Sequence, residues 1–206
     1  MTETKIDTVI FDIGRVLVAY DPHLLFRQIL PDEAAVDRFL AEICTSEWNY
    51  QQDLGRSWDV AIAERIARFP EHEDAIRAFR TRWQEMVPGP IPESVDLLEA
   101  LHRNGVPLYS ITNFSSDTFA ETKARFPFLS LFRDIVVSAE EGLGKPDPRL
   151  FRLAVDRFGI EPQRSLFIDD VAANVEGARS VGLQAVQFTS PAALRADFER
   201  FGLPVA

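Results

Sequence analysis

The sequence has a single cysteine and no long apolar run. Cys44 is the only cysteine among the 206 residues, which excludes an internal disulfide and any multi-cysteine metal site. No apolar stretch reaches the length that crosses a membrane, and the opening MTETKIDTVIFD lacks the basic and apolar regions of a secretory signal. These absences predict a soluble, cytoplasmic protein that does not act at a membrane.

Basic residues are also scarce. The chain carries 22 Lys and Arg against 32 Asp and Glu, a net charge of −10. Such a balance disfavours nucleic acid and anionic membranes as partners, because the surface as a whole repels phosphate. A small phosphorylated molecule remains a candidate ligand, since it needs only a locally positive pocket or a bound cation. The sequence leaves the oligomeric state open.

Short apolar runs alternate with amphipathic helical patterns, which predicts an α/β fold. The expected strands are 8–11, 106–111, 134–138, 165–169 and 184–188, and the expected helices are 93–105, 147–159, 172–182 and 190–202. Asp147 and Ser190 each precede a proline, as helix N-caps often do, and Gly105 is a plausible C-terminal cap. Continuous apolar strands alternating with helices indicate a Rossmann-like, doubly wound parallel sheet covered on both faces.

The segment after the first strand has a different character. Helical patterns recur at 34–43, 60–69 and 75–86 without a convincing strand, and the proline-rich VPGPIP at 87–92 marks a boundary. We therefore expect an α/β core domain of residues 1–19 and 90–206, interrupted by an all-helical domain of residues 20–89.

Polar side chains follow four of the expected strands. Parallel strands present their carboxyl ends at one edge of the sheet, where ligands bind. The residues expected at that edge are Asp12, Thr112, Asn113, Lys145, Asp169, Asp170 and, shortly after them, Asn174. Carboxylates with a backbone carbonyl suit Mg²⁺, a lysine balances the charge of a phosphoryl group, and an aspartate can attack phosphorus. The set predicts phosphoryl transfer.

The motifs FDIG, ITN, GKPDP and FIDD-x3-N, in this order, resemble the haloacid dehalogenase superfamily across nearly the whole chain. Within it, the chain is most similar to subfamily I phosphatase-like members with a helical cap. The resemblance implies that Asp12 is the nucleophile, Thr112 the phosphoryl-binding hydroxyl and Lys145 the charge stabiliser. It further implies that Asp170 binds Mg²⁺ directly while Asp169 holds metal-bound water, although the sequence alone leaves open which of the pair is the direct ligand.

The resemblance also places the inserted helices above the active site. Within TSEWNYQQDLGRS (45–57), Trp48, Asn49 and Asp53 are candidates for contacting substrate. The alternatives are that Trp48 packs in the interior of the insertion and that Asp53 caps a helix. For Asn113, substrate binding and a turn role are both open, and Asn174 is expected to hydrogen-bond the strand-end loop. The three histidines show no ligand spacing.

Two positions depart from the family pattern. The usual general acid, an aspartate two residues after the nucleophile, is replaced by Gly14, which still supplies the backbone carbonyl that the family uses as a metal ligand. General acid–base help is worth about 10²–10⁴-fold in rate, so its loss predicts slower turnover. Arg15 is the second departure, and its guanidinium is a candidate for binding a substrate phosphate or carboxylate.

Three functions fit these residues. The first is a Mg²⁺-dependent phosphatase that hydrolyses a small phosphorylated metabolite, such as a sugar phosphate, through an aspartyl-phosphate intermediate. The second is a 2-haloacid dehalogenase, which uses the same nucleophile without metal; those enzymes resemble one another in having non-acidic residues at the position of the acidic pair. The third is a binding or regulatory protein with impaired catalysis, which only Gly14 supports.

Overall fold

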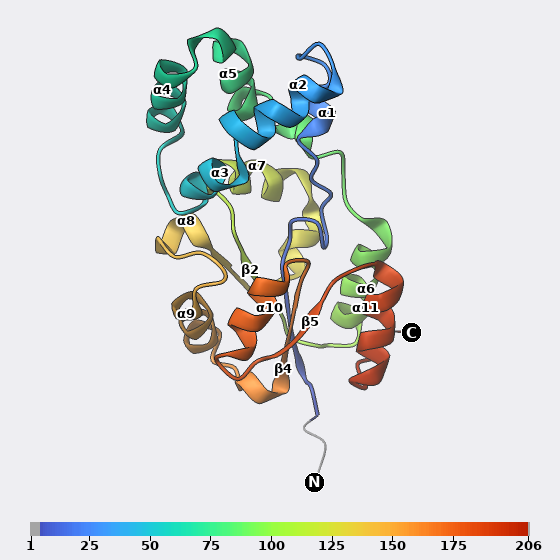
Figure 1. The fold of residues 1–206 in the computed structure, drawn as a ribbon. Helices are drawn as coiled ribbons and strands as arrows, with labels where there is room; N and C mark the ends of the chain where they lie inside the picture. The colour runs from blue at the N-terminus through green and yellow to red at the C-terminus, as the bar shows by residue number, and fades with distance from the viewer. Residues whose placement is uncertain (1–4, 206) are drawn as a thin grey trace.

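A five-stranded parallel sheet forms the centre of the protein (Figure 1), in a computed structural model that describes residues 5–205. The strands are β1 (Thr8–Phe11), β2 (Leu108–Thr112), β3 (Asp134–Val137), β4 (Ser165–Asp169) and β5 (Gln184–Gln187), arranged in the order β3-β2-β1-β4-β5. All four pairings are parallel. The predicted Rossmann-like α/β class is therefore confirmed.

Helices cover both faces of the sheet, which explains why its strands are apolar throughout. Val9 and Phe11 point to the face covered by α6 (Pro92–Arg103) and α11 (Pro191–Arg200). Ile10 belongs to the opposite cluster, together with buried side chains of α9 (Pro148–Phe158) and α10 (Ala172–Arg179). Successive side chains of a strand point to opposite faces, so burial on both sides requires an unbroken apolar run.

The remaining elements beyond α6 connect these layers. They are α7 (Ser116–Arg125), α8 (Ser138–Glu141) and the 3₁₀ turns Pro127–Leu131 and Pro162–Arg164. The predicted N-caps are confirmed, because Asp147 accepts a hydrogen bond from the Arg149 amide and Ser190 accepts one from the Ala193 amide. Gly105 follows α6 with φ +74°, the left-handed conformation that suits glycine after a helix.

Four strand boundaries differ from the prediction by one or two residues. β2 ends at Thr112 rather than 111, and β5 ends at Gln187 rather than 188. The second strand begins at Leu108 rather than 106, since Pro107 has no N–H to donate to a neighbouring strand. The third ends at Val137, because Ser138 already starts α8.

Between β1 and α6 the structure is helical, as expected for residues 20–89. The helices are α1 (His23–Phe26), α2 (Glu33–Arg38), α3 (Ser46–Asp53), α4 (Trp58–Arg68) and α5 (Glu73–Thr81), with a π-helical turn at Phe39–Ile43 and 3₁₀ turns at Pro70–His72 and Trp83–Met86. α3 lies in the polar–aromatic stretch for which the sequence predicted no helix. Its start is defined by Thr45, whose hydroxyl accepts from the Trp48 amide at 3.0 Å.

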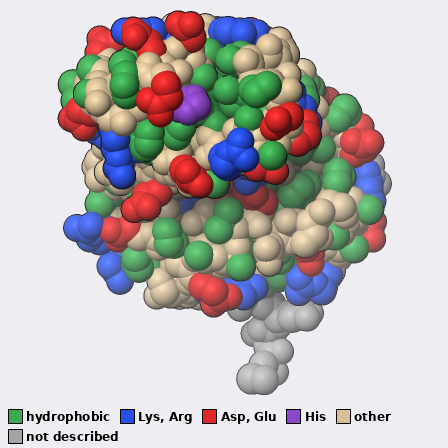
Figure 2. Space-filling model, turned by 45° about the horizontal axis from the view of Figure 1, so that its top comes forward, with side chains coloured by type: hydrophobic (Ala, Val, Ile, Leu, Met, Phe, Trp, Pro, Cys, Tyr) green, Lys and Arg blue, Asp and Glu red, His purple; other side chains and the backbone are tan. Residues whose placement is uncertain are grey.

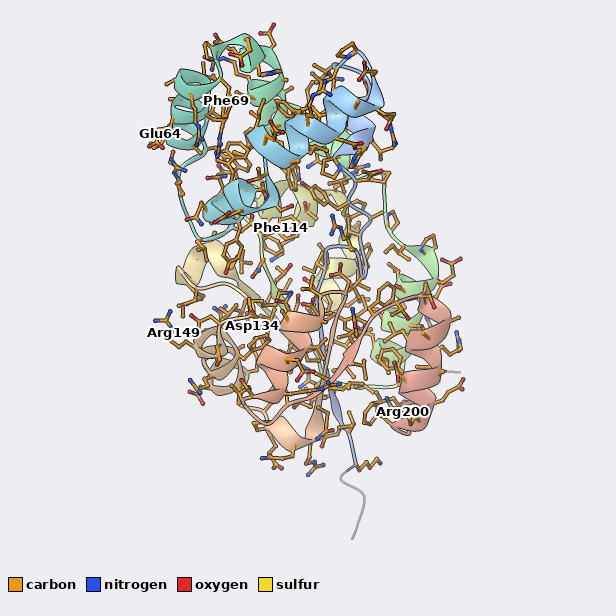
Figure 3. The ribbon with its side chains drawn as sticks, viewed as in Figure 1. Glu64, Phe69, Phe114, Asp134, Arg149 and Arg200 are labelled. Atoms are coloured by element: carbon orange, nitrogen blue, oxygen red, sulfur yellow. The ribbon has the colours of Figure 1, made fainter. Side chains whose placement is uncertain are left out.

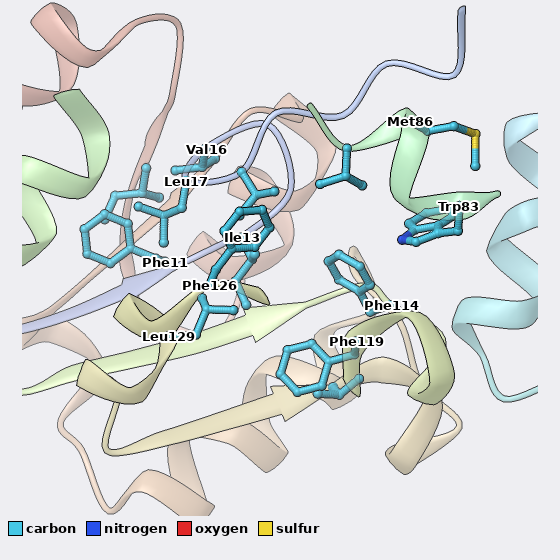
Figure 4. Close-up of a cluster of buried hydrophobic side chains, with 14 of the residues drawn as sticks. Phe11, Ile13, Val16, Leu17, Trp83, Met86, Phe114, Phe119, Phe126 and Leu129 are labelled. Carbon is cyan, nitrogen blue, oxygen red and sulfur yellow. The ribbon is translucent and has the colours of Figure 1, made fainter. Parts of the chain in front are cut away.

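The helical insertion leaves and rejoins the sheet-bearing part at one point. The Ala19 amide donates to the Gly89 carbonyl at 2.9 Å, and the Ile91 amide donates to the Leu17 carbonyl at 2.8 Å. The inserted helices gather beyond the carboxyl ends of the strands (Figure 1). One apolar cluster joins the two parts, with Trp83 of the insertion against Phe114 at 6.3 Å between ring centroids (Figure 4). That residues 20–89 form a separate domain stays a prediction.

Gly177 of α10 allows the helix to lie against the loop that carries Lys145. A Cβ at this position would stand 2.5 Å from the Pro146 carbonyl oxygen and 2.9 Å from Phe151 Cε2. The Pro146 main chain and the buried Phe151 ring have no room to move aside, so α10 would have to shift away from the loop.

We expect Gly177→Ala to lower the free energy of unfolding by about 1–3 kcal/mol, because the overpacking cost exceeds the helix-propensity gain of about 0.5–1 kcal/mol. Urea denaturation measures the change. Gly89→Ala is the matched control, since a Cβ there meets nothing within 4 Å. Equal stability of the two variants would contradict the close approach.

Candidate active site

A buried lysine lies between two buried carboxylates at the carboxyl edge of the sheet. Lys145 Nζ is 2.9 Å from Asp12 Oδ1 and 2.6 Å from Asp169 Oδ2. Asp12 follows β1, Asp169 ends the neighbouring β4, and Lys145 comes from the loop after β3 and α8. The arrangement confirms the expectation that these strand ends converge.

Asp12 is held by one of its two oxygens. Its Oδ1 accepts from the Thr112 hydroxyl at 3.0 Å and from the Ile13 amide at 2.7 Å, in addition to Lys145. Its own amide donates to the Ile168 carbonyl at 2.8 Å, which fixes the main chain to β4. Among residues 5–205 no donor is bonded to Oδ2. That oxygen is available to a ligand.

Burial shifts the titration of these groups. Desolvation raises the pKa of Asp12 to about 6, against the opposing effect of the Lys145 cation. For Lys145, burial alone would lower the pKa, but the charges of Asp12 and Asp169 outweigh it and the pKa is raised. The lysine therefore stays protonated at neutral pH and neutralises part of the negative charge around it.

The two acids after β4 have different surroundings. Asp169 is fully buried, and its Oδ1 accepts from the Val171 amide at 2.8 Å and from Asn174 Nδ2 at 2.9 Å. Both of its oxygens are thus occupied by protein donors. Asp170 is only partly buried, and desolvation raises its pKa. Asp170 is consequently the freer carboxylate of the pair.

The donor set at this edge fits a hard divalent cation. Carboxylate oxygens of Asp12, Asp169 and Asp170 all lie within 4.8 Å of one another. The Gly14 carbonyl accepts no hydrogen bond from the part of the chain that the structure describes. Oxygen ligands of this kind, with room for water, are what Mg²⁺ requires.

Asn113 fixes the main chain of Lys145. Its Nδ2 donates to the Lys145 carbonyl at 3.0 Å, and its Oδ1 accepts from the Lys145 amide at 2.9 Å. The two bonds tie the end of β2 to the lysine loop. Asn113 therefore positions Lys145 in this structure, and it also lines the cavity described next.

A cavity of about 410 Å³ opens between the strand ends and the helical insertion. Asp12, Gly14, Arg15, Asn49, Asp53, Asn113, Lys145, Asp170 and Asn174 line it, together with Tyr20, His23, Leu40, Tyr50, Phe79, Trp83, Val87 and Phe114 among others. The space-filling view shows the surface hollowed between the two parts (Figure 2), and Phe114 lies at the level where they meet (Figure 3).

The insertion contributes two of its three predicted site residues to this cavity. Asn49 and Asp53 line the wall, and Asn49 Nδ2 donates to Asp53 Oδ2 at 3.2 Å. Trp48 is not brought there: it is 4% exposed and packs edge-on against Trp58 and Phe79. Its large ring is buried in the interior of the insertion, the alternative that the sequence left open.

The cavity wall also contains two stacked aromatic side chains, Tyr20 and Trp83, that the sequence did not predict at the site. The Arg15 guanidinium lies 5.6 Å from the ring centroid of Tyr20, which stacks on Trp83 at 5.1 Å. Arg15 itself has φ +58°, a left-handed conformation that is uncommon for a non-glycine residue. Tyr20 and Trp83 carry no motif, and only the folding of the insertion back onto the sheet places them at the site.

The chain belongs to the haloacid dehalogenase-like hydrolase family, whose sequence profile matches residues 6–182. A phosphoserine phosphatase of Thermus thermophilus is 36% identical over 96 residues, which cover 46% of this chain and 39% of that protein. The match therefore spans less than half of that relative's length. A sesquiterpene phosphatase of Aspergillus oryzae is 25% identical over 192 residues, 90% of this chain and 91% of that protein.

Solved structures share the fold. A family enzyme from Bacteroides thetaiotaomicron, crystallised with magnesium and inorganic phosphate, superposes with a TM-score of 0.70 at 19% identity, covering 89% of this chain and 94% of that one. An L-2-haloacid dehalogenase from Xanthobacter autotrophicus has a TM-score of 0.65 at 15% identity, covering 96% and 84%. Phosphatase and dehalogenase relatives thus have the same architecture, and the site residues must decide between them.

Removing the lysine tests how the two buried carboxylates are balanced. We expect Lys145→Met to lower the free energy of unfolding at pH 8 by about 3–5 kcal/mol, since two buried carboxylates lose their counter-charge. Desolvation already raises the pKa of Asp12 in the folded protein. Loss of the lysine cation raises it further, so the folded variant binds more protons than the unfolded chain and its stability falls as pH rises.

The destabilisation should therefore be larger at pH 8 than at pH 5, measured by urea denaturation in the presence of EDTA. Lys123→Met removes an exposed lysine and serves as the control. If the loss of unfolding free energy in Lys145→Met does not change with pH, Lys145 does not neutralise the buried carboxylates.

Proposed function

We propose that the protein is a Mg²⁺-dependent phosphatase that hydrolyses a small phosphomonoester through an aspartyl-phosphate intermediate. The observation that carries the proposal is the geometry of Asp12. Three donors hold Oδ1 and none among residues 5–205 holds Oδ2, and Asp12 lines a cavity together with a buried lysine and a second carboxylate. A carboxylate oriented in this way is suited to attack phosphorus.

The neighbouring groups fit the charge that develops during such an attack. Lys145 places a cation beside the nucleophile, and the Thr112 hydroxyl is within reach of the same position. Bound Mg²⁺, held by Asp12, the Gly14 carbonyl and Asp170, would neutralise phosphoryl oxygens. Asp169 keeps Lys145 in place through Oδ2, while Asn174 orients Asp169.

A metal-free dehalogenase is the second candidate, and the acidic pair disfavours it. With Asp12, Asp169 and Asp170 close together, a single lysine leaves excess negative charge in a buried site. Burying uncompensated carboxylates is costly unless a cation joins them. A haloacid would add a further carboxylate to the same place.

The cavity wall favours a leaving group with an apolar portion. Leu40, Phe79, Trp83, Val87 and Phe114 supply aliphatic and aromatic surface. Two buried polar atoms, Trp83 Nε1 and Asn49 Oδ1, have no hydrogen-bond partner within residues 5–205. The relative that acts on a sesquiterpene fits the same preference.

Asp12→Asn should abolish phosphate release, because an amide is a poor nucleophile toward phosphorus. Purified protein is assayed for inorganic phosphate on a panel of phosphomonoesters with Mg²⁺ and with EDTA. Release that needs Mg²⁺ and disappears in the variant is expected. Release that survives either change, or chloride release from 2-chloropropionate in EDTA, would overturn the proposal.

The substrate preference is tested with the same panel. We expect aryl, short alkyl and prenyl monophosphates to give higher kcat/KM than hexose phosphates. Trp83→Leu should raise KM for the apolar substrates because it removes the indole surface and donor. Higher kcat/KM for sugar phosphates would contradict this preference and leave the phosphatase reaction itself standing.

A further inference from the structure

The cavity contains one carboxyl group outside the strand-end cluster. Gly14 deprives Asp12 of the neighbouring acid that would protonate a leaving alcohol, and Asp53 of the insertion lines the same cavity. The side chain belongs to the helical insertion and is not part of the group of acids that would hold a cation.

Asp53 is badly placed for a purely structural role. It is the last residue of α3, where helix carbonyls point toward it and disfavour a negative charge. It does not cap the next helix, since α4 follows Ser57 as N-cap. No lysine or arginine among residues 5–205 forms an ion pair with it, and its hydrogen-bond donors are the Asn49 side-chain amide and the Ser115 main-chain amide.

α3 is nevertheless fixed to the loops that carry the reacting groups. The Ser138 hydroxyl donates to the Asp53 carbonyl and accepts from the Phe114 amide at 3.0 Å. Phe114 follows Thr112 by two residues, and the Tyr50 hydroxyl donates to the Lys145 carbonyl at 3.3 Å. A Cβ on Gly144 would stand 2.5 Å from that hydroxyl, so the helix lies directly on the lysine loop.

The other titratable groups on the wall are poor proton donors at neutral pH or are already engaged. Burial raises the pKa of the Tyr20 and Tyr50 hydroxyls. It also raises the pKa of the Cys44 thiol, to about 12. Both ring nitrogens of His23 are paired, at 3.1 Å with Asp21 and 3.3 Å with Asp37. Arg15 and Lys145 are the cations of the cavity.

Burial also raises the pKa of Asp53, but for a carboxyl group this brings the pKa toward neutral pH. Desolvation raises its pKa to about 7, partly offset by the Ser115 amide. A carboxyl group in this range is protonated often enough to give a proton near neutral pH and can take one back.

We propose that Asp53 is the general acid and base of this phosphatase, replacing the carboxyl group that Gly14 lacks. The inference rests on the proposed function and adds a catalytic residue from the helical insertion to it.

Asp53 gives up a proton in the first step of the reaction and regains one in the second. In the first, Asp12 Oδ2 bonds to phosphorus, the bond from phosphorus to the ester oxygen breaks, and that oxygen takes the Asp53 proton to leave as an alcohol. In the second, ionised Asp53 accepts a proton from water while the water oxygen bonds to phosphorus. The bond from phosphorus to Asp12 then breaks, hydrogen phosphate leaves, and both aspartates return to their starting forms.

The test compares leaving groups of different basicity in Asp53→Asn. An alkyl oxyanion needs protonation and p-nitrophenolate does not, so the rate of alcohol release in the first turnover should fall about 10²-fold or more for an alkyl phosphate, while the rate of p-nitrophenol release in the first turnover changes little. The second step is the same for both substrates, and loss of the base should slow it equally for both. In the wild type, the single-turnover rate on the alkyl phosphate should decline as pH rises past the Asp53 pKa of about 7, and this decline should vanish in the variant.

Two further variants sharpen the result. Glu47→Gln changes an exposed carboxylate on the same helix and should behave as wild type. A Cβ at Gly14 would meet nothing within 4 Å, and the residue has no positive φ, so Gly14→Asp can restore the family acid. Gly14→Asp combined with Asp53→Asn should recover alkyl phosphate turnover.

Equal losses of the first-turnover release rate on both substrates, or a double variant without recovery, would overturn the role of Asp53 and assign it to binding or structure. These results differ from failure of the proposed function itself, in which the wild type releases no phosphate from either substrate and Asp12→Asn changes nothing.

Discussion

The ion pairs of Lys145 with Asp12 and Asp169 are the constraint on which the rest of the site depends. They lie at distances of 2.9 and 2.6 Å in a buried environment, where an unpaired charge would be costly. Thr112 and Asn113 at the end of β2 and Asn174 of α10 then complete the arrangement. The parallel sheet brings these residues to one edge, which places acidic side chains close together. Lys145 neutralises part of their charge and so lowers the cost of burying them.

The helical insertion gives this edge its cavity. It joins the sheet-bearing part through the paired segments around Leu17–Ala19 and Gly89–Ile91, and α3 lies on the lysine loop. Its wall combines apolar and aromatic side chains with the polar side chains of His23, Thr45, Ser46, Asn49 and Asp53. A wall of low dielectric strengthens the charge interactions of Asp12. The one carboxyl group that the insertion adds to the cavity is that of Asp53, and Gly14 has no side chain to supply another.

Much of this organisation could be predicted from the sequence because it depends on local patterns. Apolar runs ending in Asp12, Thr112 and Asp169 located the strands and their edge, and Asp147 and Ser190 located helix starts. The insertion was harder. α3 has little hydrophobic periodicity, so the sequence did not predict it as a helix. Trp48 is buried in the insertion whereas Trp83 lines the cavity, and residue type does not distinguish the two. The contacts of Tyr20 and Trp83 depend on how the insertion folds back, which no local pattern encodes.

The proposed function requires Asp12 to attack phosphorus. Acid quenching of a single turnover with phosphate-labelled substrate, followed by peptide mapping, tests it most directly. We expect the label on the peptide that contains Asp12, absent in Asp12→Asn and accumulating most when the second step is slowed. Phosphate release without any label on that peptide, or a label on another residue, would contradict the account.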